Sequence, residues 1–211
     1  MKLISTLLIL LTLSTMSISA ANPIALPAPE KTGGLTTAEA FSLRRSTREF
    51  NPTRKLPLQT VSNLRWSAAG TNRPAGHRPN PPALGREDIT LYLFTDSAVY
   101  VYDHTANALK PVADGDHRAL VAGAQDFVTE APASVVIVSD FGKFSDLGEA
   151  AAASMGTADA GIVSQNINIF CAANGLATVT RASMDAAAIA KLLGLGSAAK
   201  PVLNNPVGYA K

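Results

Sequence analysis

The stretch Leu43-Arg44-Arg45-Ser46-Thr47-Arg48-Glu49-Phe50 places three arginines and two hydroxyl side chains within five consecutive residues. Eight of the ten arginines lie between positions 44 and 86, a window that contains one lysine and one acidic residue. The whole chain of 211 residues carries a formal net charge of only +2. A local cluster of guanidinium groups favours an anionic partner, and their planar pairs of donors suit phosphate best.

Helices are expected on both sides of this stretch. Thr36 and Glu39 have the spacing of a capping box, which predicts a helix from there to about Arg45. Pro57 suits the first position of a second helix, in which apolar residues recur at helical spacing. The next segment, residues 71–88, contains four prolines and three arginines. Because prolines restrict a chain, this segment is expected to be a shaped binding loop.

The remainder of the chain contains further strands and helices. Alternating or β-branched patterns predict strands at residues 89–95, 98–103, 109–112, 133–139, 178–180 and 202–209. Helical patterns occur at residues 116–127, 144–153, 157–174 and 185–193. This order of elements predicts an α+β domain. The helix at 157–174 is apolar on nearly every side, so it belongs either in the core or in an obligate interface.

The first twenty residues have the features of a secretory signal peptide. Lys2 provides a positive charge, and residues 3–13 form an apolar segment too short to span a bilayer comfortably. Small residues follow, and cleavage is expected after Ala20 or Ala21. The sequence therefore predicts an exported, periplasmic protein, with an uncleaved N-terminal anchor as the alternative.

Residues 21–34 are rich in proline, alanine and glycine and are expected to form a linker. One domain is expected to follow at residues 35–211, since this length and a hydrophobic content of 47% suit a single sizeable core. The chain has one cysteine, Cys171, which excludes an internal disulfide. It lies in an apolar run and is expected in the core.

Several short segments match the spacing of known functional motifs, but their surroundings in the chain are not those that the motifs require. Residues 194–199 match a dinucleotide fingerprint, but they follow an expected helix where that site requires a strand. The β-lactamase-like motifs at residues 31–33 and 197–200 occur in reversed order. The three histidines are scattered, so no metal site is expected. Export and the near-neutral total charge disfavour nucleic acid as the partner of the arginines.

The pieces that remain resemble the nitroreductase-like family of FMN-dependent oxidoreductases. The resemblance extends from Leu35 to the C-terminus and is most specific at the arginine stretch. It continues, in the order of the family, through residues 78–83, 165–177 and 206–209. It implies an α+β fold with a central, mostly antiparallel sheet flanked by helices. It also implies a homodimer with two FMN sites at the interface.

The resemblance assigns roles to the arginine stretch. Arg44, Arg45 and Ser46, together with Arg48, match the run that holds the phosphate and ribityl chain of FMN. Arg48 also matches a cation that reaches toward N1 and O2 of the flavin ring. A fixed cation there stabilises the negative charge that reduction places near N1. The alternative is a solvated basic surface patch.

A second set of implied contacts comes from the proline-rich loop. Pro81, Pro82, Ala83 and Gly85 match a loop that lies against the flavin bound by the other subunit. The family often has serine and asparagine where this chain has Pro82 and Gly85, so two hydrogen-bonding side chains are absent. Glu87 is the nearest substitute.

The remaining implied contacts lie near the C-terminus. Thr180, Arg181, Ala182 and Ser183 match a turn over one face of the ring, in which backbone N–H groups of Ala182 and Ser183 bind N5 and O4. For Arg181, a solvent-facing position in the turn is an equal alternative. Lys211 resembles a C-terminal basic residue near the phosphate.

The resemblance implies an exported FMN-dependent oxidoreductase with a ping-pong cycle. Hydride would come from a reduced donor such as NAD(P)H, and electrons would pass to a nitroaromatic or quinone-type acceptor. The chemistry is the flavin's, so no catalytic side chain is expected. Three alternatives stay open: a flavoenzyme with another electron source, a flavin-binding or flavin-carrying protein without turnover, and a dimeric structural protein that has lost FMN.

Overall fold

A seven-stranded antiparallel sheet forms the centre of the domain. The computed structural model describes residues 22–211, so the expected signal peptide at residues 1–20 lies outside the described residues. The strand order is β1-β4-β3-β2-β5-β7-β6, and every neighbouring pair is antiparallel. The strands are β1 (Ile24–Ala25), β2 (Ile89–Thr95), β3 (Ala98–Asp103), β4 (Ala108–Asp114), β5 (Ala133–Asp140), β6 (Ala177–Thr178) and β7 (Ala199–Gly208).

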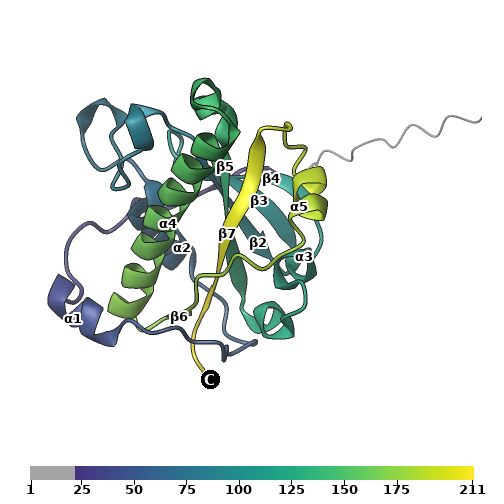
Figure 1. Ribbon diagram of the computed structural model, residues 1–211. Coiled ribbons are helices and arrows are strands. Elements are labelled where there is room, and N and C mark those ends of the chain that lie inside the picture. Colours follow the sequence, from purple (N-terminus) through teal and green to yellow (C-terminus); the bar gives the residue numbers. More distant parts are fainter. Residues whose placement is uncertain (1–21) are drawn as a thin grey trace, which may run out of the picture.

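Helices cover both faces of the sheet. Figure 1 shows α2 and α4 on one side and α3 and α5 on the other. The α-helices are α1 (Thr37–Leu43), α2 (Leu58–Ala69), α3 (Arg118–Ala122), α4 (Glu149–Ala173) and α5 (Ala186–Leu192). Four short 3₁₀ helices are η1 (Pro74–Gly76), η2 (Ala83–Gly85), η3 (Asp126–Glu130) and η4 (Phe141–Leu147). The expected α+β fold with a flanked antiparallel sheet is confirmed.

Alternation along the strands builds two hydrophobic cores. Leu91 and Leu93 of β2 face α2 and α4, whereas Tyr92 and Phe94 face α3 and α5. Successive side chains of a strand point to opposite faces, which explains this division. Strand β5, predicted as buried from its run of β-branched residues, lies between β2 and β7 and is almost entirely buried.

Two helical predictions are wrong. The helices expected at residues 144–153 and 157–174 form one helix of 25 residues, α4, and η4 precedes it. The helix expected at residues 116–127 is the five-residue α3, followed by the separate η3. Gly123, which ends α3, has φ of 57°, and this left-handed conformation stops the helix.

The segment expected as a linker contacts the domain. Within it, Ile24 and Ala25 form β1, which pairs with β4, and Leu26 is buried. The hydroxyl of Ser62 on α2 donates to the carbonyl of Pro27 at 2.5 Å. The described part of the chain contains no helix that is both long and apolar enough to cross a bilayer.

Candidate functional site

The arginine stretch follows directly from the C-terminal end of helix α1 and lies at the surface. The hydroxyl of Thr36 accepts from the backbone N–H of Glu39, and the Glu39 carboxylate accepts from Thr36 at 2.7 Å, so the predicted capping box is present. These hydrogen bonds lower the pKa of Glu39. The helix ends at Leu43, because Arg44 takes an extended conformation and starts the loop.

Two anchors fix this loop against the end of the sheet. The N–H of Thr47 donates to the carbonyl of Thr178 on β6 at 2.9 Å. Phe50, which is fully buried, forms an antiparallel bridge with Ala210 near the C-terminus. The residues before and between these anchors are exposed, so the side chains of Arg44, Arg45, Ser46 and Arg48 lie in solvent.

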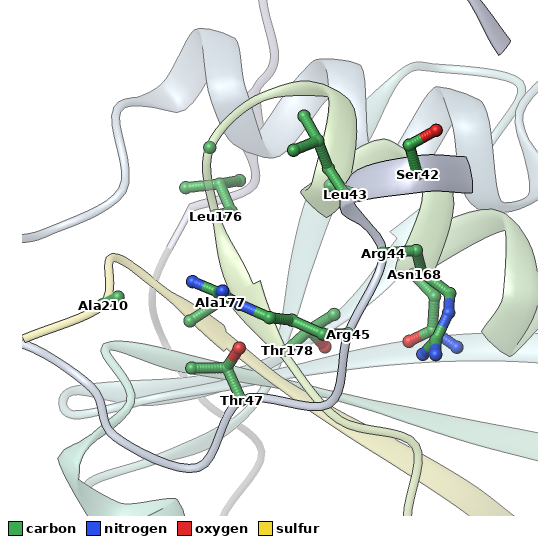
Figure 2. Close-up of a pocket in the computed structure, with 12 residues that line it drawn as sticks. Ser42, Leu43, Arg44, Arg45, Thr47, Asn168, Leu176, Ala177, Thr178 and Ala210 are labelled. Atoms are coloured by element: carbon green, nitrogen blue, oxygen red, sulfur yellow. The ribbon is translucent and has the colours of Figure 1, made fainter. Parts of the chain in front are cut away.

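A cavity of about 330 Å³ lies between this loop and the C-terminal end of α4. Its walls come from α1 and its loop, the last turns of α4, β6 and the C-terminal tail. Figure 2 shows Arg44 and Arg45 leaving the loop in different directions, Arg45 toward Ala177 and Arg44 toward Asn168. The lining residues used below are Arg44, Arg45, Thr47, Asn168, Thr178 and Ala210.

The arginines of this loop lack internal partners; Arg44 and Arg45 line the cavity, whereas Ser46 and Arg48 do not. Among the described residues, none accepts a hydrogen bond from, or forms an ion pair with, the guanidinium of Arg44, Arg45 or Arg48. By contrast, the nearby cation Lys55 forms an ion pair with Asp96. An unpaired group of guanidinium donors beside a cavity suits a phosphate ester, which accepts several charge-assisted hydrogen bonds at once.

A buried polar network supports the floor of the cavity. The amide of Asn168 donates to the hydroxyl of Thr180 at 2.9 Å and accepts from Asn205 at 3.2 Å. Ser164 is 2.6 Å from the Thr180 hydroxyl and donates to Asn205 at 2.7 Å. The network joins α4 to β7 and to the segment after β6, so it holds the cavity and the turn at residues 180–183 in fixed relation.

Sequence reasoning missed Ser164, Thr178 and Asn205 as parts of the site. The polar residues embedded in the apolar helix at 157–174 were the available signal, because a buried amide needs a hydrogen-bonding partner. Their partners lie 12 to 41 residues away in the sequence. Only the fold brings these side chains together.

The predicted turn at Thr180–Ser183 adjoins this network. Thr180, Ala182 and Ser183 are exposed, and Thr180 reaches the cavity wall through Asn168. Arg181 differs, because only 6% of it is exposed. Its guanidinium donates to Gln125, to Asn204 and to the carbonyls of two residues of α3 at 2.7–2.9 Å.

The solvent-facing alternative for Arg181 is therefore wrong. Its backbone N–H and carbonyl also pair with Asn204 in a β-bridge. Burial lowers the pKa of Arg181. Arg181 connects α3 to β7. Its expected contact with a cofactor stays a prediction, and its hydrogen bonds inside the protein do not favour such a contact.

Lys211 lies next to Ala210 of the cavity wall and forms an ion pair with Glu130 at 2.8 Å. The hydrogen bond to Glu130 raises the pKa of Lys211, and the charge of Glu49 adds to this effect. Its predicted contact with the phosphate stays a prediction.

The proline-rich loop contacts the N-terminal half of α4, away from the arginine cavity. The N–H of Ala83 in η2 donates to the carboxylate of Asp159 at 2.8 Å. Asp159 and Asn168 are nine residues apart on α4, which corresponds to about 14 Å along a helix. Within one protomer, Pro81–Gly85 and the arginine cavity are thus separated by about two and a half helical turns.

The loop borders a cavity of its own, of about 430 Å³, lined by Pro81, Pro82 and Gly85. Glu87, the expected substitute for the missing side chains, forms an ion pair with Arg78 at 2.8 Å. Leu84, at the tip, is 62% exposed and has φ of 53°, and Gly85 has φ of 70°. The segment Pro81–Gly85 therefore presents backbone and apolar groups, while charged residues elsewhere in the loop, such as Arg73 and Arg78, also line this cavity.

The described residues contain no group of three or more His, Cys, Asp and Glu side chains placed to hold a metal ion. Cys171 is buried in the core, where loss of hydration raises the pKa of its thiol. A buried thiol of this kind is inert as a nucleophile.

Comparisons with known proteins identify the family to which this fold belongs. Residues 42–209 match the model of the nitroreductase family. A candidate nitroreductase from Ralstonia eutropha JMP134 is 32% identical, with a TM-score of 0.83 and 90% of each chain covered. A search of curated proteins gave no significant match.

More distant structures share the fold alone. A chain of the Escherichia coli microcin synthetase McbBCD complex is 19% identical with a TM-score of 0.71, covering 98% of this chain and 85% of that one. A candidate NADH dehydrogenase/NAD(P)H nitroreductase from Parabacteroides distasonis is 19% identical with a TM-score of 0.58, and the match covers 82% of this chain and 86% of that one. The family model spans most of the chain, including the arginine loop, α4 and β7, and the chain belongs to the nitroreductase family.

Proposed function

We propose that this oxidoreductase uses FMN and is exported to the periplasm after cleavage of residues 1–20. The observation that supports the cofactor is the pair of unpaired guanidinium side chains, Arg44 and Arg45, that line the cavity at the end of α4, with the unpaired Arg48 following in the same loop. Family membership supports a flavin, and the donors present fit its phosphate.

Different residues would contact different parts of FMN. Arg44, Arg45 and Ser46 would bind the phosphate, and Arg48 would place positive charge at the ring. The exposed backbone of Ala182 and Ser183 would face the ring edge. FMN, when bound, supplies the hydride chemistry, so the protein contributes binding, orientation and electrostatics.

We further propose that the functional unit is a homodimer. The loop at Pro81–Gly85 lies too far along α4 to meet the arginine cavity of its own protomer. A second copy can bring its loop to this cavity, which completes one site at each end of the interface.

NAD(P)H is the proposed electron donor, and nitroaromatic or quinone-type compounds are the proposed acceptors, in a ping-pong cycle. The NAD(P)H nitroreductase named among the structural neighbours supports a nicotinamide donor. An exported flavin-binding protein without turnover is the alternative, because Pro82 and Gly85 leave the ring with few side-chain contacts.

Titration of the purified protein with FMN tests the cofactor. Arg44→Ala and Arg45→Ala should each weaken binding about tenfold to a hundredfold, because each removes charge-assisted hydrogen bonds. Lys191→Ala is the matched control: Lys191 is an exposed cation on α5, on the opposite face of the sheet, and its loss should leave the affinity unchanged. Equal affinity in all four proteins would refute the phosphate assignment.

Anaerobic addition of NADPH to the FMN-loaded protein separates the two functions. Rapid loss of the flavin absorbance, restored by a quinone, is expected for the oxidoreductase. An FMN complex that no nicotinamide reduces would be a carrier. A colourless protein that ignores added FMN would contradict both.

A further inference from the structure

Two consecutive asparagines of β7, Asn204 and Asn205, lie beside the turn at residues 180–183, and both are fully buried. Neighbouring residues of a strand point to opposite faces of its sheet. The amide of Asn204 accordingly lies on the α3 side of the sheet, and the amide of Asn205 lies on the α4 side. Because a buried amide needs hydrogen-bonding partners, the contacts of these two side chains show what they hold in place.

Asn205 holds the start of the turn from the α4 side. Its Nδ2 donates to Oδ1 of Asn168 at 3.2 Å, and its Oδ1 accepts from the Ser164 hydroxyl at 2.7 Å. The hydroxyl of Thr180 lies 2.9 Å from the amide of Asn168 and 2.6 Å from the Ser164 hydroxyl. Since Ser164 gives its one proton to Asn205, Thr180 must donate its own proton to Ser164. The Thr180 hydroxyl is therefore oriented by the network and has no proton left for a ligand.

Asn204 holds the rest of the turn from the α3 side. Its Nδ2 donates to the carbonyl of Ser183 at 3.1 Å, and its Oδ1 accepts from the guanidinium of Arg181 at 2.7 Å. Its backbone N–H and carbonyl also pair with the backbone of Arg181, at 2.7 and 2.9 Å. The residues on both sides of Ala182 are therefore attached to one asparagine.

The backbone ladder of the sheet holds this turn only in part. Strand β6 pairs with β7 at Ala177 and Thr178, and a single bridge between Arg181 and Asn204 continues the pairing. Between these two places β7 contains Pro206, which has no N–H to donate to a ladder. The asparagine side chains supply hydrogen bonds where the ladder is interrupted.

The turn contains two free backbone donors. Among the described residues, none accepts a hydrogen bond from the N–H of Ala182 or Ser183, and both residues are exposed. Donors on a segment that is already held lose less entropy when they bind an acceptor than donors on a mobile loop. The turn therefore presents two N–H groups to solvent on a segment that is fixed from both faces of the sheet.

We propose that Asn204 and Asn205 are positioning residues, which hold the N–H groups of Ala182 and Ser183 against the acceptor atoms at the edge of a flat heteroaromatic ring. The ring is that of FMN, and in this respect the inference rests on the proposed function. The asparagines act through the turn and do not touch the ring. Their loss should lower affinity for the ring and leave the binding of the phosphate at the arginine cavity intact.

Titrations with FMN and riboflavin separate ring from phosphate, because riboflavin has the same ring and lacks the phosphate. Asn204→Ala and Asn205→Ala should each weaken the binding of both flavins about tenfold. Arg44→Ala should weaken the binding of FMN alone. Val99→Ala is the control for lost stability: it removes buried methyl groups from β3, which β2 and β5 separate from β7, and it should change flavin affinity less than about twofold.

Trypsin tests the turn without any flavin. The bond after Arg181 should resist cleavage in the wild type, because Arg181 is almost fully buried and is held by Asn204. In both asparagine variants this bond should be cut about tenfold faster or more, through local opening of the turn. The bond after the fully buried Arg65 should stay intact, which separates local opening from global unfolding. Val99→Ala should show no selective cleavage after Arg181.

The proposal would be overturned by wild-type flavin affinities in both asparagine variants, or by a turn that trypsin cuts no faster in them. Weaker binding of FMN with unchanged binding of riboflavin would also contradict it, because the effect would then lie at the phosphate. If neither asparagine variant folds, Thr180→Val, which keeps the shape and lacks the hydroxyl, should weaken both flavins. A wild-type protein that binds neither flavin would refute the proposed cofactor, while the trypsin result still decides whether the asparagines hold the turn.

Discussion

The arginines of this chain occupy two different environments. Substitution of a buried arginine should lower the stability of the fold, whereas substitution of an exposed one should weaken FMN binding. The guanidinium of Arg181 makes four hydrogen bonds inside the protein, whereas Arg44 makes none with a described residue. Arg181→Met would leave the side chains of Gln125 and Asn204 and two carbonyls without their donor. We expect the free energy of unfolding to fall by about 3 kcal/mol or more, measured by urea denaturation.

Two further variants sharpen this test. Arg181→Lys should also destabilise, because one ammonium cannot reach the acceptors that a planar guanidinium joins. Arg44→Ala is the control and should change stability by no more than about 0.5 kcal/mol, although it weakens FMN binding. Wild-type stability of Arg181→Met would contradict the structural role.

The sequence predicted the arginine cluster but not the burial of its members. Arg65 was counted within the basic window, yet it is fully buried on α2, where it donates to the carbonyl of Leu91 and lies 5.0 Å from the Tyr102 ring. Desolvation lowers its pKa to about 9. A count along the chain cannot show this, because the helix turns Arg65 to the same face as Leu64 and Ala68.

At the scale of elements, α4 depends on close contact with β5. Gly156 lacks a side chain where a Cβ atom would meet both the Ser139 hydroxyl and the Phe141 ring. Alanine normally favours a helix over glycine by about 1 kcal/mol. We nevertheless expect Gly156→Ala to destabilise by about 1–3 kcal/mol, because the overpacked helix must shift from the sheet.

Thermal and urea unfolding would measure this effect. Gly196→Ala is the matched control, since no described atom lies within 4 Å of its added Cβ and its φ is not left-handed. That variant should be unchanged or slightly more stable, through the lower entropy of its unfolded chain. A Gly156→Ala protein as stable as the wild type would mean that α4 is free to move on β5.

The same glycine explains the wrong helix boundary at residues 153–157. Two helices were expected on either side of these residues, whereas one helix continues through them and uses Gly156 for tertiary contact. The strands were predicted well, because alternation and β-branched runs at residues 89–95 and 133–139 are local signals. Strand β1 has two residues and depends on its partner β4, so no local pattern could reveal it.

For the site, the sequence revealed the residues that form a motif and missed those that only the fold assembles. The arginine stretch stood out by charge and spacing, and it does border a cavity. The buried acids Asp88 and Asp159 did not stand out, because they are ordinary carboxylates 71 residues apart. Their burial, which raises the pKa of Asp88, arises only when α4 lies on the loop.

At the scale of the molecule, one face of α4 with Ile162 at its centre lies in solvent. The exposed residues of this face are mostly small or uncharged, namely Thr157, Ala158, Gly161, Ile162 and Gln165, and Ile162 is a large hydrophobic residue with 37% exposure. Helix α1 packs beside α4 and adds Phe41, which is 58% exposed. An uncharged surface with two exposed large hydrophobic side chains suits an interface between two copies.

Ile162→Glu should therefore convert the proposed dimer to a monomer, because a carboxylate at the centre of an apolar interface loses its hydration without gaining a partner. Light scattering after size exclusion would measure the mass, and Ala187→Glu on α5, at the opposite face of the sheet, should stay dimeric. FMN affinity should fall together with the dimer, since each arginine cavity then lacks the Pro81–Gly85 loop of a second copy. A monomeric Ile162→Glu protein with full FMN affinity would show that one protomer forms the whole site, and a dimeric one would place the interface elsewhere.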